Sequence, residues 1–283
     1  MKMNHRLKSN LIYQLKENKL GILSILVIVI LSIASILAFL SPHDPNKINV
    51  MNRLATPSKS HLFGTDEMGR DYFTRALYGG RVSLTVGFLS MIISTIIGTI
   101  VGTISGYFGN KVDSIIMRII DILMSIPTFF LILILNAYLK PGIQNIIIII
   151  GLFSWMSIAR IVRGETISVK EREYVLYSQV IGEKPNVIIR KHIIPNIFPT
   201  VIVASTLNIA SAILMESSLS FLGLGVRQPN SSWGSMLKYA QGYMGEAPYL
   251  TFFPGILILM TVLSFNVLGD IFRVAFEPKA NND

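Results

Sequence analysis

Six long runs of uncharged residues dominate this chain and limit what it can fold into. As an α-helix rising 1.5 Å per residue, each run is long enough to cross about 30 Å of hydrocarbon. Only 14% of the residues are charged, against about 25% in a typical soluble domain. The sequence therefore predicts an all-α polytopic membrane protein with six transmembrane helices, rather than a soluble protein with six buried helices. The runs cover residues 20–42, 82–110, 122–139, 141–159, 193–215 and 247–269.

The distribution of Lys and Arg predicts how the chain crosses the membrane. Of the 25 Lys and Arg, 16 fall in segments 1–19, 106–118, 160–195 and 272–283. Positively charged loops stay in the cytoplasm, so both termini are expected to be cytoplasmic. The first run is too long for the apolar part of a secretory signal and is read as a retained helix. The net charge of +9 then reflects this bias and attraction to lipid headgroups, and we find no nucleic-acid-binding motif.

The runs divide the chain into three parts. Residues 1–81 form a basic lead-in, the first transmembrane helix and an outer segment. Residues 82–271 form a five-helix core with a cytoplasmic loop at 164–195 and a second outer segment at 216–250. Residues 272–283 form a cytoplasmic tail. We expect a short amphipathic helix at 72–78 to lead into the second run.

The second run carries a stripe of glycines at four-residue spacing: Gly98, Gly102 and Gly106. Small residues at this spacing lie on one face of a helix and let another backbone approach closely. Packing within the subunit is favoured over a contact between subunits, because glycine is frequent in membrane helices in general.

The third helix contains a helix-breaking sequence, Ser125-Ile-Pro127, preceded by Arg118 and Asp121. Arg118 and Asp121 have the i,i+3 spacing of an ion pair on one helix face. Non-helical backbone at membrane depth is tolerated against protein or beside a water-filled path. These four residues are therefore candidates for a gate in a translocation path, and a kink that only serves packing is the alternative.

The loop at 164–195 is predicted to hold two short helices. Glu171–Ile181 forms the first, with Glu171 and Glu173 in its first turn and Gly182 as its stop. The second opens at Pro185, and Pro195 ends it and begins the next transmembrane helix.

An apolar side of the first short helix gives this loop two possible partners. The apolar side comprises Val175, Leu176, Val180 and Ile181. It fits a hydrophobic groove on a partner protein, or an anionic lipid surface that also attracts the basic residues of the loop. The residues alone leave this choice open.

The loop resembles the conserved cytoplasmic loop of permease subunits in ATP-binding-cassette (ABC) importers, with its glycine and closing Ile-Pro. Beyond residue 60 the chain resembles the C-type permeases of the peptide/nickel branch, in segments such as Phe63–Asp71, Arg118–Pro127, Glu216–Gly225 and Phe265–Asp270. The resemblance implies an ATPase-coupling role for Glu171, Glu173, Tyr174, Val175, Leu176, Tyr177, Gly182, Arg190 and Pro195. One departure is Leu176-Tyr177-Ser178, where the family usually has Glu-Ala-Ala; it removes a glutamate and favours a more apolar docking contact.

The resemblance also implies a function and an assembly. It implies the type I ABC importer permease fold in a bacterial or archaeal cell membrane. A homologous second permease, two cytoplasmic ABC ATPases and an extracytoplasmic substrate-binding protein are the implied partners, with outer segments 41–81 and 216–250 meeting the binding protein. Peptides are the expected cargo, and nickel or a metal–chelator complex is the alternative.

The sequence argues against other classes of function. It has no phosphate-binding loop, so ATP and Mg²⁺ are expected on the partner ATPases and this chain is not expected to be an enzyme. A self-sufficient transporter or channel would carry charge near the midplane, and the six runs are charge-free there. The four histidines are scattered in sequence and are read as interfacial, so no metal site is expected: His5, His43, His61 and His192.

Overall fold

The structure is a computed structural model, and it describes residues 10, 11, 13–139 and 142–276. Much of the expected lead-in, with His5, and part of the expected tail lie outside these residues. The described part is helical, and Thr65 and Asp71 form an isolated β-bridge. Its helices are α2 (Lys19–Ile36), α3 (Tyr72–Phe108), α4 (Asn110–Met124), α5 (Thr128–Tyr138), α6 (Ile143–Lys170), α7 (Glu173–Val180), α8 (Pro185–Ile188), α9 (Ile194–Phe221), α10 (Trp233–Ala240) and α11 (Tyr249–Phe276).

Among the described residues, five helical segments are long and apolar enough to cross a membrane. A sixth crossing is reached if α4 and α5, bent by 73° at the break between them, count as one broken span. This agrees with the six predicted runs, of which the third contains the helix-breaking proline.

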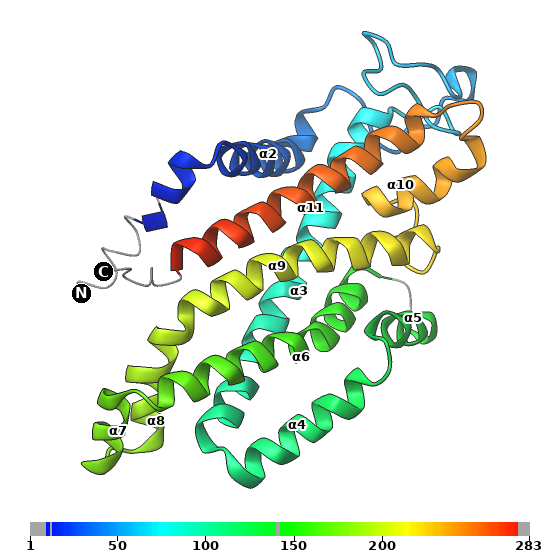
Figure 1. The fold of residues 1–283 in the computed structure, drawn as a ribbon. Helices are drawn as coiled ribbons and strands as arrows, with labels where there is room; N and C mark the ends of the chain where they lie inside the picture. Colours follow the sequence, from blue (N-terminus) through cyan, green and yellow to red (C-terminus); the bar gives the residue numbers. More distant parts are fainter. Residues whose placement is uncertain (1–9, 12, 140–141, 277–283) are drawn as a thin grey trace.

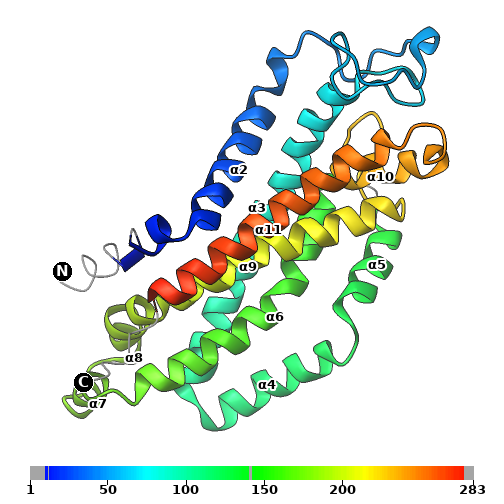
Figure 2. The same ribbon diagram turned by 45° about the horizontal axis from the view of Figure 1, so that its top comes forward.

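The long helices form a bundle around α3, α6, α9 and α11 (Figures 1 and 2). Helix α2 lies on one side of this bundle, against α11, and α4 and α5 lie on the other side. The short helices α7 and α8 are at one end, whereas residues 41–71 and α10 are at the opposite end. The predicted cytoplasmic loop and the predicted outer segments thus lie at opposite ends of the bundle.

Several helices are longer than the uncharged runs predicted. The expected short helix at 72–78 is the first part of α3, a single helix of 37 residues whose N-cap is Asp71. Helix α6 continues past the expected end of its run to Lys170. Charge marks the edge of the hydrocarbon, but it does not interrupt the backbone hydrogen bonds, so a helix continues into water until a cap or breaker ends it.

The glycine stripe of α3 packs against α6 of the same chain. A Cβ atom built on Gly98 would lie 2.7 Å from Cβ of Ile158, and one on Gly102 would lie 2.5 Å from the carbonyl oxygen of Ala159. One on Gly106 would lie 2.8 Å from Cβ of Thr166. These distances are too short for a side chain, so the absence of one lets the two backbones approach closely.

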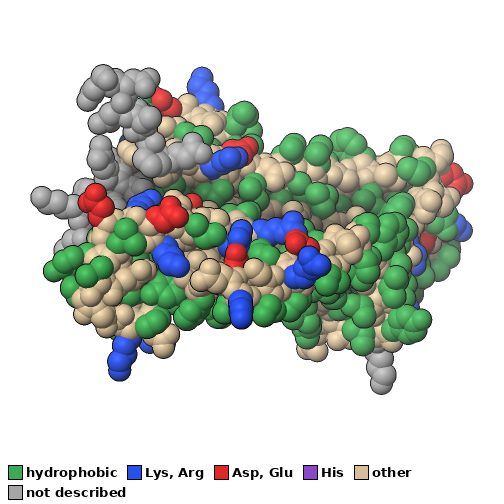
Figure 3. Space-filling model, turned by 60° about the horizontal axis from the view of Figure 1, so that its bottom comes forward, with side chains coloured by type: hydrophobic (Ala, Val, Ile, Leu, Met, Phe, Trp, Pro, Cys, Tyr) green, Lys and Arg blue, Asp and Glu red, His purple; other side chains and the backbone are tan. Residues whose placement is uncertain are grey.

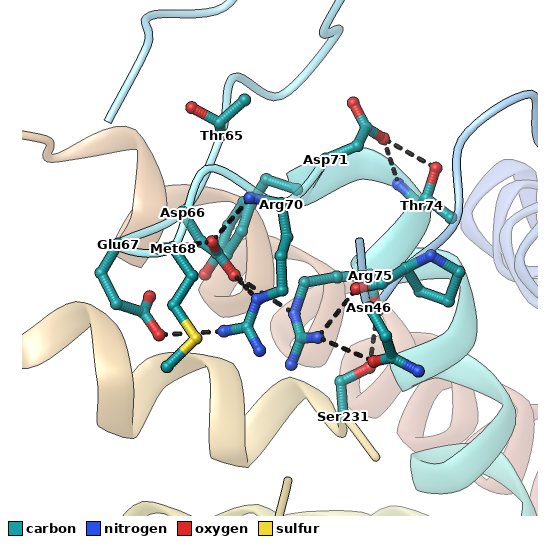
Figure 4. Close-up of polar contacts among 12 residues, drawn as sticks. Asn46, Thr65, Asp66, Glu67, Met68, Arg70, Asp71, Thr74, Arg75 and Ser231 are labelled. Atoms are coloured by element: carbon teal, nitrogen blue, oxygen red, sulfur yellow. Dashed lines mark hydrogen bonds and ion pairs between the residues drawn. The ribbon is translucent and has the colours of Figure 1, made fainter. Parts of the chain in front are cut away.

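A buried charge network holds the outer segment against the end of the bundle (Figure 4). Arg70 contacts Asp66 at 2.6 Å and Glu67 at 2.9 Å, and Arg75 contacts Asp66 at 3.4 Å. Arg75 also donates to the carbonyl oxygen of Pro45 at 3.0 Å. Because two cations face two carboxylates, the buried charges are balanced within the cluster.

A second buried cluster surrounds Glu216 near the C-terminal end of α9. Its carboxylate accepts hydrogen bonds from Ser220 at 2.6 Å and from Ser83 of α3 at 3.0 Å. Ser83 in turn accepts from the backbone N–H of Trp233 at 3.3 Å, and Ser220 accepts from that of Val226 at 3.0 Å. Each of these serines thus accepts a hydrogen bond from a backbone N–H and donates one to the carboxylate. The cluster joins α3, α9 and the start of α10.

Candidate coupling loop and path helix

The loop between α6 and α9 has a well-defined turn at its centre. Helix α7 ends in a left-handed residue, Gly182, whose φ is +80°. The N–H of Gly182 donates to the carbonyl of Gln179, and that of Glu183 donates to the carbonyl of Ser178, each at 3.1 Å. This pair of bonds is the Schellman arrangement, which satisfies the last carbonyls of the helix. No atom lies within 4 Å of a Cβ built on Gly182, so the backbone conformation alone requires glycine here.

The helix boundaries in this loop differ from those predicted. Helix α6 runs to Lys170 and has Glu171 as its C-cap, so Glu171 is not in the first turn of α7, whereas Glu173 is. Pro195 does not end a helix, because α8, a π turn at Ile189–Ile193 and α9 form one continuous segment. The wider π turn lies where the proline ring would otherwise meet the carbonyl of the preceding turn. The loop is therefore one short helix, α7, followed by the start of a long one.

The base of the loop is fixed to the bundle by apolar side chains. Val175, which was predicted on the apolar side of α7 that contacts a partner, is instead fully buried, and so is Ile193 in the π turn. Both pack in one cluster with Val169 of α6 and Ile197 of α9. Burying such side chains stabilises the loop by about 1.5–3 kcal/mol each. The loop is thus attached firmly to both transmembrane segments that flank it.

The other side of α7 exposes apolar residues. Val180 is 85% exposed and Tyr177 is 67% exposed, and Tyr174, Leu176 and Ile181 are also exposed. Figure 3 brings the bottom of the Figure 1 view forward and shows hydrophobic, basic and acidic side chains together on that face. A helix anchored on one side with apolar side chains on the other presents a contact surface for a partner. We call these five residues the α7 surface.

Polar residues of the loop lie around this surface. Arg190 and Pro195 are exposed in the long helix, and Glu171 and Glu173 are exposed on either side of Arg172, between α6 and α7. His192 contacts Glu183 at 3.7 Å and the hydroxyl of Ser178 at 3.3 Å. These contacts tie α7 to the π turn.

The bend between α4 and α5 lies at the predicted breaker. Ser125 is the C-cap of α4 and donates through its hydroxyl to the carbonyl of Ile122 at 2.7 Å. Pro127 is the N-cap of α5 with ψ of 122°, outside the helical range. Both residues are exposed, as is Arg118. Proline disfavours helical conformation in the residue before it and lacks an N–H, which accounts for the break.

The ion pairs of α4 differ from the prediction. Asp121 pairs with Arg160 of α6 at 2.5 Å, rather than with Arg118 one turn earlier. A second pair, Asp113 with Arg163, joins the same two helices at 2.5 and 2.6 Å. Neither pair was predicted from the sequence, because a partner 39 or 50 residues away gives no local spacing signal. The two pairs hold α4 beside α6.

Comparison with known proteins gives the family. A family model described as the inner membrane component of binding-protein-dependent transport systems matches residues 98–282. A second model, described as the N-terminal TM domain of oligopeptide transport permease C, matches residues 9–57. Together the two matches extend over most of the chain.

Individual proteins agree with these matches. The chain is 38% identical to the oligopeptide transport system permease protein OppC of Bacillus subtilis, over 84% of this chain and 78% of that protein. It is 41% identical to the dipeptide transport system permease protein DppC of the same organism, over 84% and 75%. It is 44% identical to OppC of Escherichia coli, over 81% and 76%.

The fold is also found in a solved structure. A chain of the MetNI methionine ABC transporter in an inward-facing conformation superposes with a TM-score of 0.60 at 21% identity, covering 71% of this chain and 96% of that one. This confirms the predicted all-α fold of an ABC importer permease. On these matches, the chain belongs to the family of inner membrane components of binding-protein-dependent transport systems.

Proposed function

We propose that this chain is the transmembrane permease subunit of an ATP-driven importer and forms half of the path for peptides. Relatives at 38–44% identity are named as oligopeptide and dipeptide permeases, which favours peptides over nickel as cargo. A homologous second permease forms the other half, two cytoplasmic ATPases drive the transport, and an extracytoplasmic binding protein delivers the peptide.

The observation that carries this proposal is the α7 surface on its fixed base. The buried side chain of Val175 holds the helix in place, whereas the side chain of Val180 is almost fully exposed. An apolar helix face of this kind docks into a hydrophobic groove on a partner. Leu176 is exposed at the position where the family usually has the glutamate of Glu-Ala-Ala, so apolar contact takes the place of a charged one.

The distribution of charge and the fold support the membrane orientation that we propose. The loop at 160–195 is rich in Lys and Arg, so it faces the cytoplasm, and both termini lie on the same side. Residues 41–71 and α10 are at the other end of the bundle and face outward, toward the binding protein. The chain then resides in a bacterial or archaeal cell membrane as a multi-pass protein.

Alternating access is the mechanism that fits these parts. ATP and Mg²⁺ bind to the ATPase subunits, and closure of those subunits moves the docked α7 surface. The fixed base transfers this movement to α6 and α9, which tilt together. In this mechanism the non-helical backbone at the Ser125–Pro127 bend would lie beside the path, and the Asp121–Arg160 pair would lie near its inner mouth; the 73° bend and the ion pair support this assignment.

Aspartate substitutions on the α7 surface test the proposal. Val180→Asp changes an exposed side chain, so folding and membrane insertion are expected to be normal, while co-purification of the ATPases and peptide-stimulated ATP hydrolysis fall at least about tenfold. Met51→Asp is the matched control for co-purification alone, because Met51 is 95% exposed at the opposite end of the molecule, in the segment proposed to meet the binding protein. Normal ATPase yield with Val180→Asp would contradict the proposed docking.

The cargo is tested separately with the intact transporter. Proteoliposomes containing the complete importer and its binding protein should take up labelled peptide in the presence of ATP. Uptake of labelled nickel without uptake of peptide would show that the importer carries the alternative cargo, nickel. Peptide flux through this chain alone, without ATPases, would assign it to the self-sufficient transporters.

A further inference from the structure

Two histidines and an aspartate that are distant in sequence come together at the outer end of the molecule. His43 follows the last turn of the first transmembrane segment, His61 lies in the loop before α3, and Asp71 is the N-cap of α3. One possible ligand atom from each residue lies within 4.8 Å of those of the other two. The two imidazole rings are 5.0 Å apart at an angle of 33°.

We propose that His43, His61 and Asp71 form a binding site for a divalent transition-metal ion such as Zn²⁺. Zinc binds imidazole nitrogen and carboxylate oxygen at about 2.0–2.2 Å, and in a tetrahedral site the ligand atoms are about 3.3 Å apart. The three groups are therefore within about 1.5 Å of the required separation, which side-chain rotation can supply. Two imidazoles and one carboxylate suit zinc, copper or nickel better than calcium or magnesium, which prefer oxygen ligands alone.

The hydrogen bonds around the cluster identify the ligand atom of His43. Its Nε2 lies 3.0 Å from the carbonyl oxygen of Ser60. A carbonyl can only accept, so Nε2 carries the proton and Nδ1 of the neutral ring carries the lone pair. A donated N–H of this kind orients the ring of a metal-binding histidine.

The carboxylate of Asp71 is divided between two roles. Its Oδ2 accepts from the N–H of Thr74 at 2.8 Å and from the Thr74 hydroxyl at 2.7 Å, as Figure 4 shows. Its Oδ1 faces Nδ1 of His61 at 2.8 Å. We assign Oδ1 and this nitrogen as the other two ligand atoms, so that the metal displaces the proton between them and His61 carries its proton on Nε2. Water can occupy the fourth position, because both histidines are only partly buried.

A metal ion at this site would join two parts of the outer segment. Ser41, close to His43, already shares a hydrogen bond of 2.5 Å with Thr74, so the end of the first membrane segment lies against the start of α3. A bound ion would add a link between the same two places and would stabilise the folded form by an amount that rises with the logarithm of the free ion concentration above its Kd. This inference does not depend on the proposed importer function.

The test measures binding of Zn²⁺ to the full chain in lipid nanodiscs, purified without a polyhistidine tag and treated with a chelator. Calorimetry is expected to show one Zn²⁺ ion per chain, and Zn²⁺ is expected to raise the unfolding temperature. Substituting Co²⁺ should give the visible absorption band of a tetrahedral site.

Two substitutions remove ligands while preserving the surrounding hydrogen bonds. The amide of His43→Gln can still donate to Ser60, and that of His61→Asn can still donate to Asp71. Each should weaken Zn²⁺ binding at least about tenfold. His192→Gln, at the opposite end of the molecule, is the matched control and should bind as the unaltered chain does. Absence of Zn²⁺ binding up to about 1 mM, or unchanged binding in both ligand variants, would overturn the proposal.

Discussion

The guanidinium of Arg163 in α6 donates through Nε and Nη2 to the two carboxylate oxygens of Asp113 in α4, at 2.5 and 2.6 Å. Asp113 also accepts from the hydroxyl of Ser105 in α3 at 2.5 Å. Bidentate pairing of this kind fixes geometry as well as charge. Three helices are joined at this point, so the start of α4 is held beside the C-terminal half of α6.

Lysine at position 163 should loosen this junction. Arg163→Lys keeps the positive charge but can make only a single contact, and it should cost about 1 kcal/mol because the guanidinium is one-third exposed. Arg160→Lys is the control, since that pair is about half exposed and should contribute less. Thermal unfolding of the purified chain in detergent measures the difference. Equal effects at the two positions would contradict the special role of the bidentate pair.

Valine at position 182 should uncouple the loop from the ATPases. The left-handed conformation costs a residue with a side chain about 1–2 kcal/mol, and a β-branched residue more. Asparagine tolerates this conformation, so Gly182→Asn should retain most of the coupling. Co-purification of the ATPases and peptide-stimulated ATP hydrolysis should be lost in Gly182→Val, with membrane insertion unchanged. A normal yield of ATPase with Gly182→Val would show that the turn geometry does not govern docking.

Alanine in place of Pro127 should impair transport more than expression. Without the proline ring the α4 helix can extend through the break, so the 73° bend is expected to relax. Peptide uptake by the intact importer should fall several-fold. Pro254→Ala is a suitable control, because Pro254 lies inside α11 without breaking it. Uptake kinetics equal to those of the unaltered protein would mean that the bend serves packing alone.

Alanine at Gly102 should separate α3 from α6. The added methyl group would lie 2.5 Å from the carbonyl oxygen of Ala159 and 2.8 Å from Cβ of Val162, which are backbone and inflexible atoms. Overpacking of this kind costs about 1–3 kcal/mol. Gly255→Ala gives a matched control, because no atom lies within 4 Å of a Cβ at this position in α11. The unfolding temperature should fall only for Gly102→Ala, and equal values for the two variants would exclude the close approach.

Stability should depend on pH through Glu67. Burial, and then the neighbouring Asp66 carboxylate, raise the pKa of Glu67 above its usual value of 4.5. The folded state therefore holds the Glu67 proton more tightly than the unfolded state, so stability falls as the pH rises from 4.5 through the raised pKa. Glu67→Gln stays neutral and keeps an acceptor for Arg70, so its unfolding temperature should lack this decline. Parallel pH profiles for the two proteins would contradict the assignment.

The sequence predicted the membrane spans because a single physical requirement, about 20 uncharged residues, marks each of them. It located the helix ends poorly. Tyr72–Tyr78 belongs to a longer helix, and Pro195 lies inside one, because helix boundaries depend on caps and on local changes such as the π turn rather than on hydropathy.

The long-range contacts could not be predicted from spacing. Asp121 has Arg118 at i,i−3 and Arg160 on another helix, and only the packing of α4 beside α6 decides in favour of Arg160. In the same way, His43 and His61 are 18 positions apart and are brought together by the fold of the outer segment. The end of α7 at Gly182 could be predicted, since a glycine after an apolar helix is a local signal for a left-handed helix stop.

Residues Pro185–Phe221 form one continuous helical segment of 37 residues, which at 1.5 Å per residue is about 55 Å long. A rotation of about 10° about its N-terminal end would carry its C-terminal end sideways by about 10 Å. The carboxylate of Glu216 is near the C-terminal end and accepts a hydrogen bond from Ser83, so such a rotation must move α3 as well or break this hydrogen bond. Because the contact between Glu216 and Ser83 is either made or broken, this long helical segment is expected to favour two distinct positions over a continuous range.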